Sequence, residues 1–488
     1  MSTATDIYYK ELYEHAQVEV VALKHELAQL KKLIYGSKQE RFVPSASPTQ
    51  LSLDIQAAAP AQTTTSVQSV TYTRTVVSKT PAGTTVATGR MKLPESLPRE
   101  RIVIEPIEDV SGLKKIGEEI TEELELIEAK LIVKQYVRPK YAKQSGEGIL
   151  IGELPARPID KGIAGPGLLA QIVIDKYIDH LPLYRQMERF KRAGILIPDS
   201  TLGGWVSAVC KLLTPLYEAH KKQVLQLGYL QADETSLKVL DKDKKGTTHR
   251  GYYWVYHNPV EKVVFFDYQM GRGREGPQGI LKEFQGYLQS DGYGVYDSFD
   301  KQHGITLLGC IAHARRMFVE ALSNDKARAE YVLEQMQLLY VIEQKAKEQG
   351  LSFEQVALLR QQEAVPVLEH LGQWMKQQYV EVLPKSPIGK ALAYSIERWE
   401  KLCLYTTNGM LNIDNNGVEN QIRPVAVGRK NYLFAGSHEA AGRSAMLYSL
   451  LGTCKLHGLN PFEWFKQVLS ILPAHPINRI EELLPNHF

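Results

Sequence analysis

The sequence predicts an α/β fold in which a mixed β-sheet is preceded by helices and interrupted by an all-α insertion. Three observations support this prediction. Strand-like runs alternate with helical periodicity from Gly228 onward, residues 323–405 are helical in period throughout, and 488 residues exceed what one hydrophobic core normally serves. We therefore expect several structural units within one chain.

Residues 1–42 are predicted to form a coiled-coil helix. Apolar residues from Tyr9 to Ile34 follow a 4-3-4-3 spacing, with Lys and Glu at the flanking positions. This pattern favours self-association into a homo-oligomer, although a helix packed against its own chain has the same period. Residues 43–89 are rich in Ser, Thr, Ala and Pro and hold few charges, so they are predicted to be a flexible linker.

Two further segments precede the predicted sheet. Short β-branched runs at 102–104 and 131–137 flank an acidic stretch, which predicts a small β-rich module over residues 90–155. Residues 156–227 are predicted to be helical, with short turns between the helices. This region is either a helix-turn-helix DNA-binding unit or an ordinary all-α domain. Its basic residues that are candidates for phosphate contact are Lys176, Arg185, Arg189, Lys191 and Arg192.

Composition restricts the function classes only partly. The formal net charge is +3, so global charge neither requires nor excludes a nucleic-acid partner. The four cysteines are scattered without a C-x-x-C pair, which argues against a disulfide framework and against a cysteine-built zinc site. No leader-like segment or membrane-length apolar run occurs, so we expect a non-secreted protein without a membrane partner.

The strand pattern of residues 228–322 predicts the first part of a catalytic core. The runs YLQADETSLKVL, GYYWVYHN and VVFFDYQ are typical of an antiparallel meander. A helix, a fourth strand in GYLQSDGYG, and a strand passing into a helix in ITLLGCIAHARRMFVEAL follow. The order β-β-β-α-β-α-β-α suggests a ribonuclease-H-like architecture, whose first and fourth strands lie side by side. Residues 323–405 would be an all-α insertion leaning over the active site, 406–440 the last part of the core, and 441–488 a C-terminal helical region.

Two aspartates follow strands that should be neighbours. Asp233 is expected at the end of the first strand, with Glu234 on the opposite face. Asp291 follows the fourth strand, although an ordinary Asp-Gly turn residue has the same pattern. Phosphodiester chemistry with two divalent cations needs carboxylates on neighbouring rigid elements. The two aspartates therefore predict part of a two-metal site.

A third carboxylate is expected from a later helix. In DNNGVENQIRP, Asn415 or Asn416 is expected to cap a helix that carries Glu419 in its first turns and Arg423 along the same face. Asp414 competes for the role, but its position is typical of a residue beside a helix cap. We therefore prefer Glu419 as the third metal ligand.

Basic and aromatic residues near these acids suggest contacts with DNA. Arg316 shares a helix face with His313. The strip RPVAVGRKNYLFAGS alternates basic residues, which can hold phosphates, with apolar residues that are expected to pack beneath them against the protein. Trp399 either stacks on an unpaired base or packs in the core of the insertion. The residues expected to contact DNA are Arg185, Arg189, Arg316, Arg423, Arg429, Lys430 and Trp399.

The motifs QADET, QSDGYGVY, GCIAHARRMF and IDNNGVENQIRPVAVGRKNYLFAGS, in this order and spacing, resemble blocks of the insertion-sequence 66 family of bacterial DDE transposases. The similarity extends over most of the chain. It implies DNA cleavage and strand transfer with two Mg²⁺ or Mn²⁺ ions held by Asp233, Asp291 and Glu419. It also implies terminal repeats and target DNA as partners, accessory proteins of the same element as further candidates, and a cytoplasmic, nucleoid-associated location.

One departure from the family concerns a zinc-binding module. The family usually carries paired cysteines, but KYAKQSGEG has Lys143 and Gly146 at the positions of one C-x-x-C, and residues 109–118 lack the other pair. We therefore expect no zinc and a degenerate, zinc-finger-like module held by packing alone or a weakened DNA contact. Two other functions stay open: a nuclease that cuts without joining, and a DNA-binding architectural or regulatory protein without chemistry.

Overall fold

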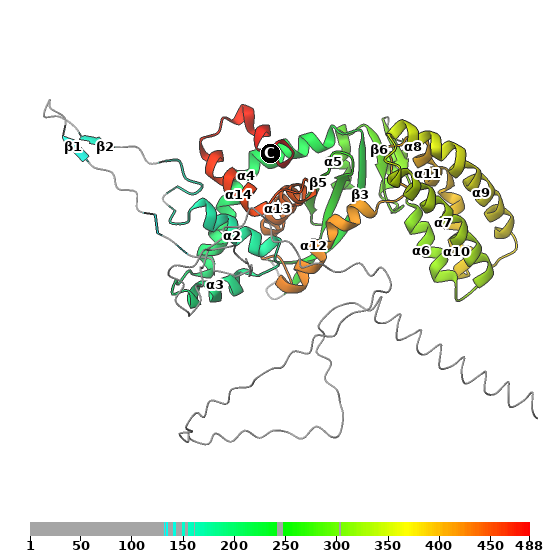
Figure 1. Cartoon of the computed structure of the whole chain (residues 1–488). Coiled ribbons are helices and arrows are strands. Elements are labelled where there is room, and N and C mark those ends of the chain that lie inside the picture. Colours follow the sequence, from blue (N-terminus) through cyan, green and yellow to red (C-terminus); the bar gives the residue numbers. More distant parts are fainter. Residues whose placement is uncertain are drawn as a thin grey trace, which may run out of the picture. The chain divides into compact units, whose positions relative to one another are not determined.

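The computed structural model describes residues 131, 133–134, 140–142, 149–151, 155–160, 162–241, 247–301 and 304–488 (Figure 1). Contacts divide the chain into Met1–Lys130 and Leu131–Phe488, and the second unit is described below. The predicted coiled coil, the linker and the strand at 102–104 lie outside the described residues.

The predicted β-rich module is described only in its last part. There β1 (Lys140–Ala142) pairs antiparallel with β2 (Ile149–Ile151). The described residues of the run 131–137 have no regular secondary structure, so that strand prediction is wrong for them.

The mixed α/β fold is confirmed by a five-stranded sheet with the order β5-β4-β3-β6-β7. Its first three strands, β3 (Tyr229–Leu240), β4 (Thr248–Asn258) and β5 (Val263–Gln269), form the predicted antiparallel meander. β6 (Gly286–Gln289) and β7 (Ile305–Leu308) then add in parallel on the other side of β3. β3 and β6, which are the first and fourth strands of this sheet in chain order, are therefore neighbours, as predicted.

The connections between the later strands contain little α-helix. α5 (Glu275–Ile280) and the 3-10 turn η1 (Leu281–Glu283) link β5 to β6, and only a 3-10 segment, η2 (Tyr296–Lys301), links β6 to β7. β7 passes directly into α6 (Ile311–Ala321), as expected. The sequence pattern had predicted an α-helix between β6 and β7, and the 3-10 segment takes its place.

Both faces of the sheet are buried, which explains why β5 begins with four consecutive apolar residues. Val264 and Phe266 belong to one hydrophobic cluster, together with the C-terminal helices. Val263 and Phe265 belong to a second cluster, on the face covered by η1 and η2. Because side chains alternate along a strand, a doubly covered strand needs apolar residues at every position.

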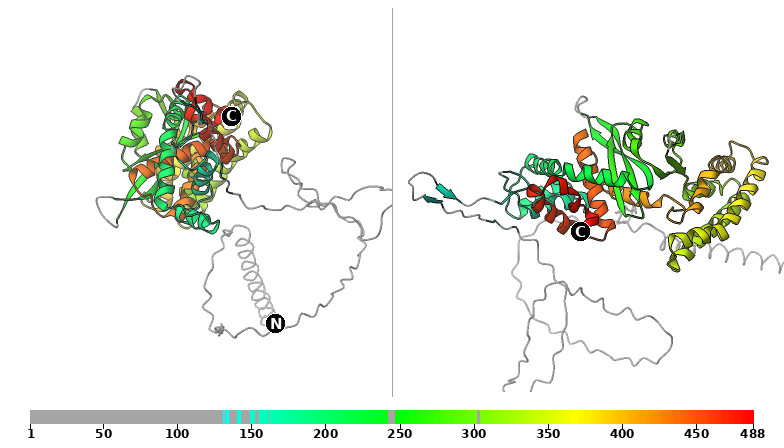
Figure 2. Two further views of the ribbon diagram at one scale, coloured as in Figure 1. Left: turned by 90° about the vertical axis from the view of Figure 1, so that its left-hand side faces the viewer. Right: turned by 90° about the horizontal axis from the view of Figure 1, so that it is seen from above.

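Helices on the β5 side of the sheet come from two distant parts of the sequence. Three helices precede the sheet: α2 (Pro166–Tyr177), α3 (Leu183–Arg192) and α4 (Asp199–Leu225). Two more helices follow it, α13 (His438–Leu456) and α14 (Pro461–Ile471). The last part of the chain forms three short 3-10 segments, η5 (Leu472–Ala474), η6 (Ile477–Leu483) and η7 (Pro485–His487). All five α-helices contribute to the same hydrophobic cluster. The arrangement is visible from two further directions in Figure 2.

Helix α13 covers the edge of the sheet. The buried hydroxyls of Ser449 and Thr453 accept hydrogen bonds from the N–H groups of Phe266, at 2.8 Å, and Val264, at 3.1 Å. These N–H groups belong to an edge strand and have no strand partner on that side. The helix therefore satisfies donors that an uncovered edge would leave exposed.

The insertion lies on the β7 side and has its own hydrophobic cluster (Figure 1). It consists of α7 (Lys326–Glu348), α8 (Phe353–Leu359), a π-helical turn η3 (Arg360–Ala364), α9 (Val365–Tyr379), α10 (Pro387–Glu397), α11 (Trp399–Cys403) and η4 (Leu404–Thr407). Buried Arg360 pairs with Glu343 and donates to the carbonyls of Tyr405 and Asn408, both at 2.9 Å. These bonds hold the chain where it returns to the sheet through α12 (Asn416–Tyr432). None of the described helices combines the length and apolarity that crossing a bilayer requires.

Candidate active site

The two aspartates occupy equivalent positions on neighbouring parallel strands. Gln231 and Gln289 are the last paired residues of β3 and β6, and their side chains are joined by a hydrogen bond of 3.1 Å. Asp233 and Asp291 each follow this pair by two residues. The expectation that Asp233 ends its strand is wrong, because β3 continues to Leu240 alongside β4. What ends near Asp233 is the pairing of β3 with β6, whose last pair is Gln231 and Gln289.

Helix α12 carries Glu419 to the same face of β3. Gln231 donates to the carbonyl of Asp414 at 2.9 Å and accepts from the N–H of Val418 at 3.2 Å. Asp233 lies two residues further along the strand and therefore faces the same side as Gln231. Thr235, two residues beyond, contacts α12 again through Arg429 at 3.0 Å. The helix thus runs past Asp233, with Glu419 in its first turns.

Asp414 has a capping role in the structure. Its Oδ1 accepts from the N–H of Asn416 at 3.1 Å, and its Oδ2 accepts from the hydroxyl of Tyr340 at 2.9 Å. Asn415 occupies the N-cap position of α12, as expected, but its side chain makes no cap bond. These contacts favour Glu419 over Asp414 as the third acid of the site.

The charges of the three acids interact at Asp233. Burial is the main reason that the pKa of Asp233 is raised to about 8. The negative charges of Glu234, Asp291 and Glu419 each add to this rise in pKa. The carboxyl of Asp233 accepts a hydrogen bond from the N–H of Glu234 at 2.7 Å, through Oδ1. A buried carboxylate among like charges is electrostatically unfavourable until a cation or a proton neutralises it.

Glu419 also faces two basic residues of α6. His313 Nε2 lies 3.6 Å from Glu419 Oε1, and Arg316 Nη2 lies 3.9 Å from Glu419 Oε2. The predicted shared face of His313 and Arg316 is therefore turned toward the third acid. The Arg316 side chain is 58% exposed, so most of its guanidinium stays accessible to a phosphate.

Sequence analysis missed an ion pair between a buried glutamate and a half-exposed arginine behind Asp233. The Glu234 side chain, 4% exposed, is bound by the guanidinium of Arg272. That guanidinium lies over the Tyr293 ring, 4.1 Å from its centroid, and the N–H of Tyr293 donates to Asp291 Oδ1 at 2.8 Å. The group therefore links the opposite face of β3 to the loop that carries Asp291. The nearest sequence signal was the pair of adjacent acids in QADET.

The insertion also contacts the Asp291 loop, and no sequence motif indicated this contact. Tyr394 Oη donates to the carbonyl of Asp291 at 2.7 Å. Arg398 lies over the Tyr394 ring, 4.6 Å from its centroid, and donates to the carbonyl of Gly292 at 3.4 Å. Gly292 has a φ of +85°, and a Cβ there would approach Arg398 Nε to 2.8 Å. Glycine is therefore required at this position, and the insertion holds the backbone of the second acid.

The donor set of the three acids fits divalent cations, because carboxylate oxygens are the ligands that Mg²⁺ and Mn²⁺ prefer. Burial, and then the neighbouring negative charges, raise the pKa of Asp233 to about 8, so its charged form is unfavourable without a cation. Within the described part of the chain, no three His, Cys, Asp or Glu side chains are already arranged closely enough to hold a metal ion. The carboxylate of Glu419 lies beside His313 and Arg316 of α6. It would have to rotate toward the two aspartates for the three acids to share a cation.

The predicted DNA-binding residues lie in different surroundings. Arg423 and Lys430 are exposed on α12, whereas Arg429 donates to Thr235 Oγ1 and to the carbonyl of Ser236. Arg429 therefore anchors α12 to β3, which differs from its predicted role. The expectation that the apolar residues of this strip pack beneath is wrong for Val427, Leu433 and Phe434, which are exposed.

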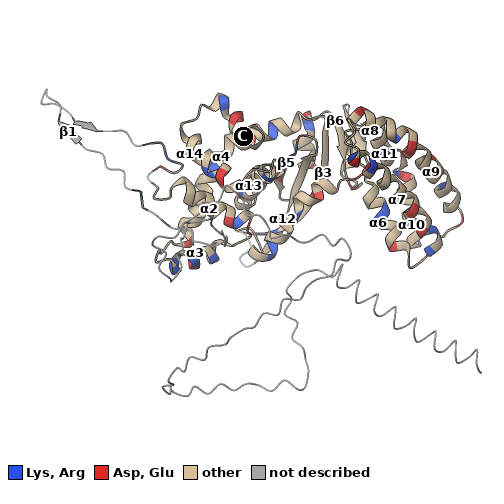
Figure 3. Ribbon diagram, in the orientation of Figure 1, with Lys and Arg blue, Asp and Glu red and all other residues tan. Residues whose placement is uncertain are grey.

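Helix α3 carries basic residues along its length (Figure 3). Arg185 is exposed and lies against the Tyr184 ring. Arg189 instead pairs with the buried Asp175 of α2 at 3.0 Å, and the Asp175 side chain is only 6% exposed. Lys191 and Arg192 are exposed at the end of the helix. Arg189 therefore holds α3 to α2, while its neighbours remain accessible to a phosphate backbone.

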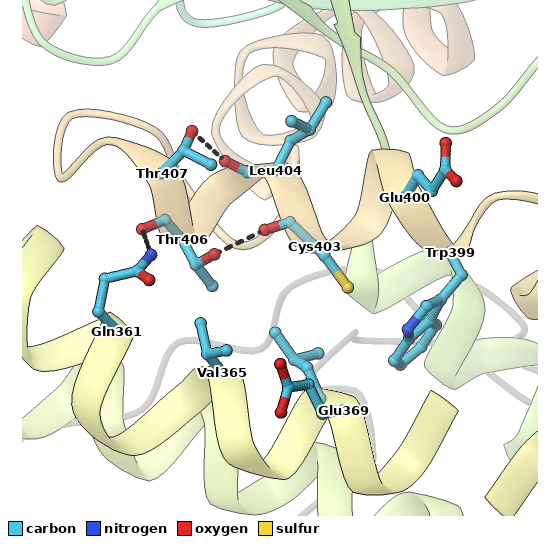
Figure 4. Close-up of a pocket in the computed structure, with 10 residues that line it drawn as sticks. Gln361, Val365, Glu369, Trp399, Glu400, Cys403, Leu404, Thr406 and Thr407 are labelled. Carbon is cyan, nitrogen blue, oxygen red and sulfur yellow. Dashed lines mark hydrogen bonds between the residues drawn. The ribbon is translucent and has the colours of Figure 1, made fainter. Parts of the chain in front are cut away.

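Trp399 lies within the insertion, partly buried against its hydrophobic cluster. A Cβ added at Gly372 of α9 would meet the Trp399 indole nitrogen at 2.5 Å, so the ring packs closely on that helix. Figure 4 shows Trp399 beside a pocket of about 330 Å³, together with Glu369, Glu400 and Cys403. Packing in the insertion accounts for Trp399, and the nearby carboxylates make this pocket unfavourable for nucleic acid.

The sequence matches the profile of the transposase IS66 family over residues 161–443, a range that contains all three acids. The chain belongs to this family. Three shorter matches accompany the first: the IS66 C-terminal element over 449–486, the transposase C of IS166 homeodomain over 22–102, and the zinc-finger binding domain of transposase IS66 over 109–142.

Curated relatives of this IS66 family chain come from Sinorhizobium fredii. The uncharacterized protein y4hP is 30% identical over 96% of this chain and 88% of its own length. The uncharacterized protein y4jD is 32% identical over 96% of this chain and 94% of its own. The uncharacterized protein y4qI is 34% identical over 80% of this chain and 76% of its own. The resemblance to the family is thus confirmed over nearly the whole chain, with DNA as the partner of its matched domains.

The segment that matches the zinc-finger profile contains neither cysteine nor histidine. Structural zinc sites in proteins are built mainly from these two residue types. The IS66 match therefore identifies the origin of the module, while the side chains usual for zinc are missing from it.

Proposed function

We propose that this IS66 family member is a DDE transposase that cuts and joins DNA at Asp233, Asp291 and Glu419. The main observation that supports this proposal is the register of β3 and β6. It places both aspartates two residues beyond the paired glutamines Gln231 and Gln289. The strand order β5-β4-β3-β6-β7 supports a ribonuclease-H-like core for this chemistry. The raised pKa of Asp233 supports a site that takes up cations.

The proposed reaction consists of two in-line displacements at phosphorus. Water first attacks at the element end and frees a 3′-hydroxyl, which then attacks a phosphodiester of target DNA. Two divalent cations bound by the carboxylates would lower the pKa of the attacking oxygen and stabilise the leaving oxygen. No covalent bond between the enzyme and DNA is needed.

Residues of the chain have distinct tasks in this proposal. Asp233 Oδ1 is occupied by the N–H of Glu234, so Oδ2 is the atom that holds the proton of the cation-free site. Arg316, beside Glu419, and Arg423, one turn further along α12, are both exposed and would bind the phosphates that flank the scissile bond. Tyr394 and Tyr293 fix the Asp291 loop through its carbonyl and carboxylate.

The deciding experiment replaces Asp233 with Asn and measures Mg²⁺-dependent nicking of DNA that carries the ends of the element encoding this chain. We expect nicking to be lost while DNA affinity is kept, because the substitution removes one metal ligand and no phosphate contact. Asp267→Asn is a matched control, since Asp267 is also a largely buried acid with a pKa raised to about 6 but lies on β5. Wild-type nicking by Asp233→Asn would reject the proposed site.

A nuclease without joining activity is the second candidate function. Such a nuclease would use the same three acids, but the 3′-hydroxyl that it frees would not attack a second DNA. Supplying pre-cleaved ends together with a supercoiled target plasmid separates the two functions. Joined product is expected from a transposase, and its absence alongside efficient nicking would favour the nuclease.

Two further parts of the proposal concern partners. The exposed basic residues of α3 would contact the backbone of terminal-repeat DNA, with Arg185 among them. Self-association through residues 1–42 would bring two element ends together, which sedimentation of the full chain and of a chain lacking those residues would test.

A further inference from the structure

Helix α12 ends in a strained turn. The N–H of Phe434 donates to the carbonyl of Tyr432 at 2.7 Å, which closes a three-residue turn around Leu433. Leu433 has a φ of 64° and a ψ of −43°. A γ-turn of this hand is rare and strained for any residue with a side chain. Such strain persists only where the surrounding structure imposes it, and it concentrates at functional sites.

The surrounding structure does impose this turn. On one side, the N–H of Leu433 donates to the carbonyl of Arg429 at 3.0 Å, and Arg429 is itself bonded to β3. On the other side, Ala435 exchanges two backbone hydrogen bonds of 2.8 Å with Lys238 and Leu240 of β3. The turn is therefore held between a helix and a strand, and its backbone has a fixed position.

The two residues at the centre of this turn are apolar and exposed to solvent. Leu433 is 62% exposed and Phe434 is 41% exposed. Their exposure contributes little to folding, since apolar side chains stabilise a fold by leaving water. Because backbone strain of this kind clusters at active sites and ligand clamps, the turn is a candidate for contact with a ligand.

The charges along α12 indicate which ligand. Glu419, Arg423, Val427 and Lys430 are spaced by four, four and three residues, so they share one face of the helix. Arg423, Val427 and Lys430 on this face are exposed. The face thus begins at the active site, continues with two accessible cations, and ends at the apolar turn. DNA phosphates bind such cations, and DNA bases pack against apolar side chains like those of the turn.

We propose that Leu433 and Phe434 form a wedge that separates or stacks on bases of the DNA bound at the active site. This inference rests on the proposed function, because it places the same DNA along α12. Leu433 lies 14 residues beyond Glu419. At a rise of about 1.5 Å per residue, the wedge lies about 21 Å along the helix from Glu419. With about 3.4 Å per nucleotide, it meets the DNA about six nucleotides from the scissile phosphate.

The test uses the full chain and duplexes that carry the end of the encoding element, with 2-aminopurine placed at successive positions on either side of the cleavage point. Ca²⁺ replaces Mg²⁺ so that DNA binds without being cut. We expect the fluorescence of 2-aminopurine to rise near the sixth nucleotide, where the wedge unstacks the duplex, and to stay low at other positions.

Variants identify the source of that signal. Leu433→Ala and Phe434→Ala should each abolish the local fluorescence rise and weaken binding about five- to tenfold, as loss of a base contact does. A mismatch at the same position should restore binding of the variants, because the base step is then already unstacked. Leu358→Ala is the matched control, since Leu358 of α8 is also 62% exposed but belongs to the insertion.

The outcomes separate this inference from the proposed function. A flat 2-aminopurine scan with a wild-type chain that cuts DNA in an Asp233-dependent manner would overturn the wedge alone. An unchanged signal in both alanine variants, with thermal unfolding like that of the wild type, would do the same. Loss of the signal in both variants, but not in Leu358→Ala, would establish the wedge.

Discussion

Gln231 of β3 accepts a hydrogen bond from the N–H of Val418 at the start of α12, over 3.2 Å. The two residues are 187 positions apart, with the whole insertion between them. This contact fixes the register of α12 on the sheet and so decides that the residue after Val418, Glu419, faces the strand of Asp233. A buried amide thus sets where α12, which carries Glu419 in its first turns, lies along the strand of Asp233.

Replacing this amide should misplace the third acid. Gln231→Leu removes the donor to the carbonyl of Asp414 and one of two acceptors of the N–H of Val418, which keeps the carbonyl of Asn415 at 3.1 Å. The unpaired carbonyl of Asp414 should cost about 1–3 kcal/mol of unfolding free energy. We expect cleavage to fall about a hundredfold, because small misplacements of reacting groups are costly. Gln186→Leu is the control: Gln186 is equally buried and bonds two carbonyls, of Ile172 and Leu181, so it should lose stability but keep specific activity. Equal activity losses in both variants would contradict this role of Gln231.

Tyr394 should influence cation affinity from outside the site. Tyr394→Phe removes the bond to the carbonyl of Asp291, so this loop should hold its carboxylate less firmly. We expect the Mg²⁺ concentration for half-maximal cleavage to rise about three- to tenfold, as a lost supporting contact around a metal ligand does. Tyr331→Phe, which removes a hydroxyl bond to His370 elsewhere in the insertion, should leave the Mg²⁺ dependence unchanged. A matching shift in both variants would indicate a general effect of the insertion.

The pKa of Asp233 predicts how the stability of the cation-free protein depends on pH. In the folded state the pKa is raised to about 8, above its usual value near 3.9. Proton binding therefore stabilises the fold fully below the usual pKa, and this contribution is lost as pH rises through about 8. Urea unfolding in a chelator should show Asp233→Asn gaining stability relative to the wild type between about pH 5 and about pH 8.5. A difference that stays constant with pH would contradict the raised pKa.

The cover of the sheet edge by α13 can be tested with two small substitutions. Thr453→Val and Ser449→Ala each remove a hydroxyl that accepts from a buried N–H of β5. Each variant should lose about 1–3 kcal/mol of unfolding free energy, since an unpaired buried donor is costly. Denaturant unfolding measures this loss, and Ser470→Ala, on the exposed side of α14, serves as the neutral control. Neutral behaviour of both variants would show that water replaces the hydroxyls.

Substitutions on α3 should distinguish an arginine with a structural role, Arg189, from the exposed basic residues Arg185 and Arg192. Arg189→Ala removes the partner of the buried Asp175 and should lower stability. Arg192→Gln should leave stability unchanged and, if α3 tracks DNA phosphates, reduce the slope of log affinity against log salt by about one. Thermal unfolding and DNA binding at several salt concentrations measure both effects. An unchanged salt slope in Arg192→Gln and Arg185→Gln would exclude α3 from the DNA interface.

The strands were predictable because their signal is local. The doubly buried run of β5 and the bounded runs of β3 and β4 specify extended structure whatever follows them, and their positions agree with the sequence interpretation. The helical period of the insertion is local in the same sense. Conversely, the segment between β6 and β7 is too short and too weakly periodic to distinguish an α-helix from the observed 3-10 segment η2.

The sequence alone determined which acids were candidates, since Asp233 and Asp291 follow apolar runs and Glu419 lies in a helical start. The tertiary structure decided what surrounds them. The bonds of Gln231 to α12, of Tyr394 to the Asp291 loop and of Arg272 to Glu234 all join segments at least 38 residues apart. No periodic pattern encodes such pairs, because each depends on how separately folded elements pack. The same reason explains Arg189, Arg429 and Trp399, whose residue types suggested DNA contacts and whose packing engages them within the protein.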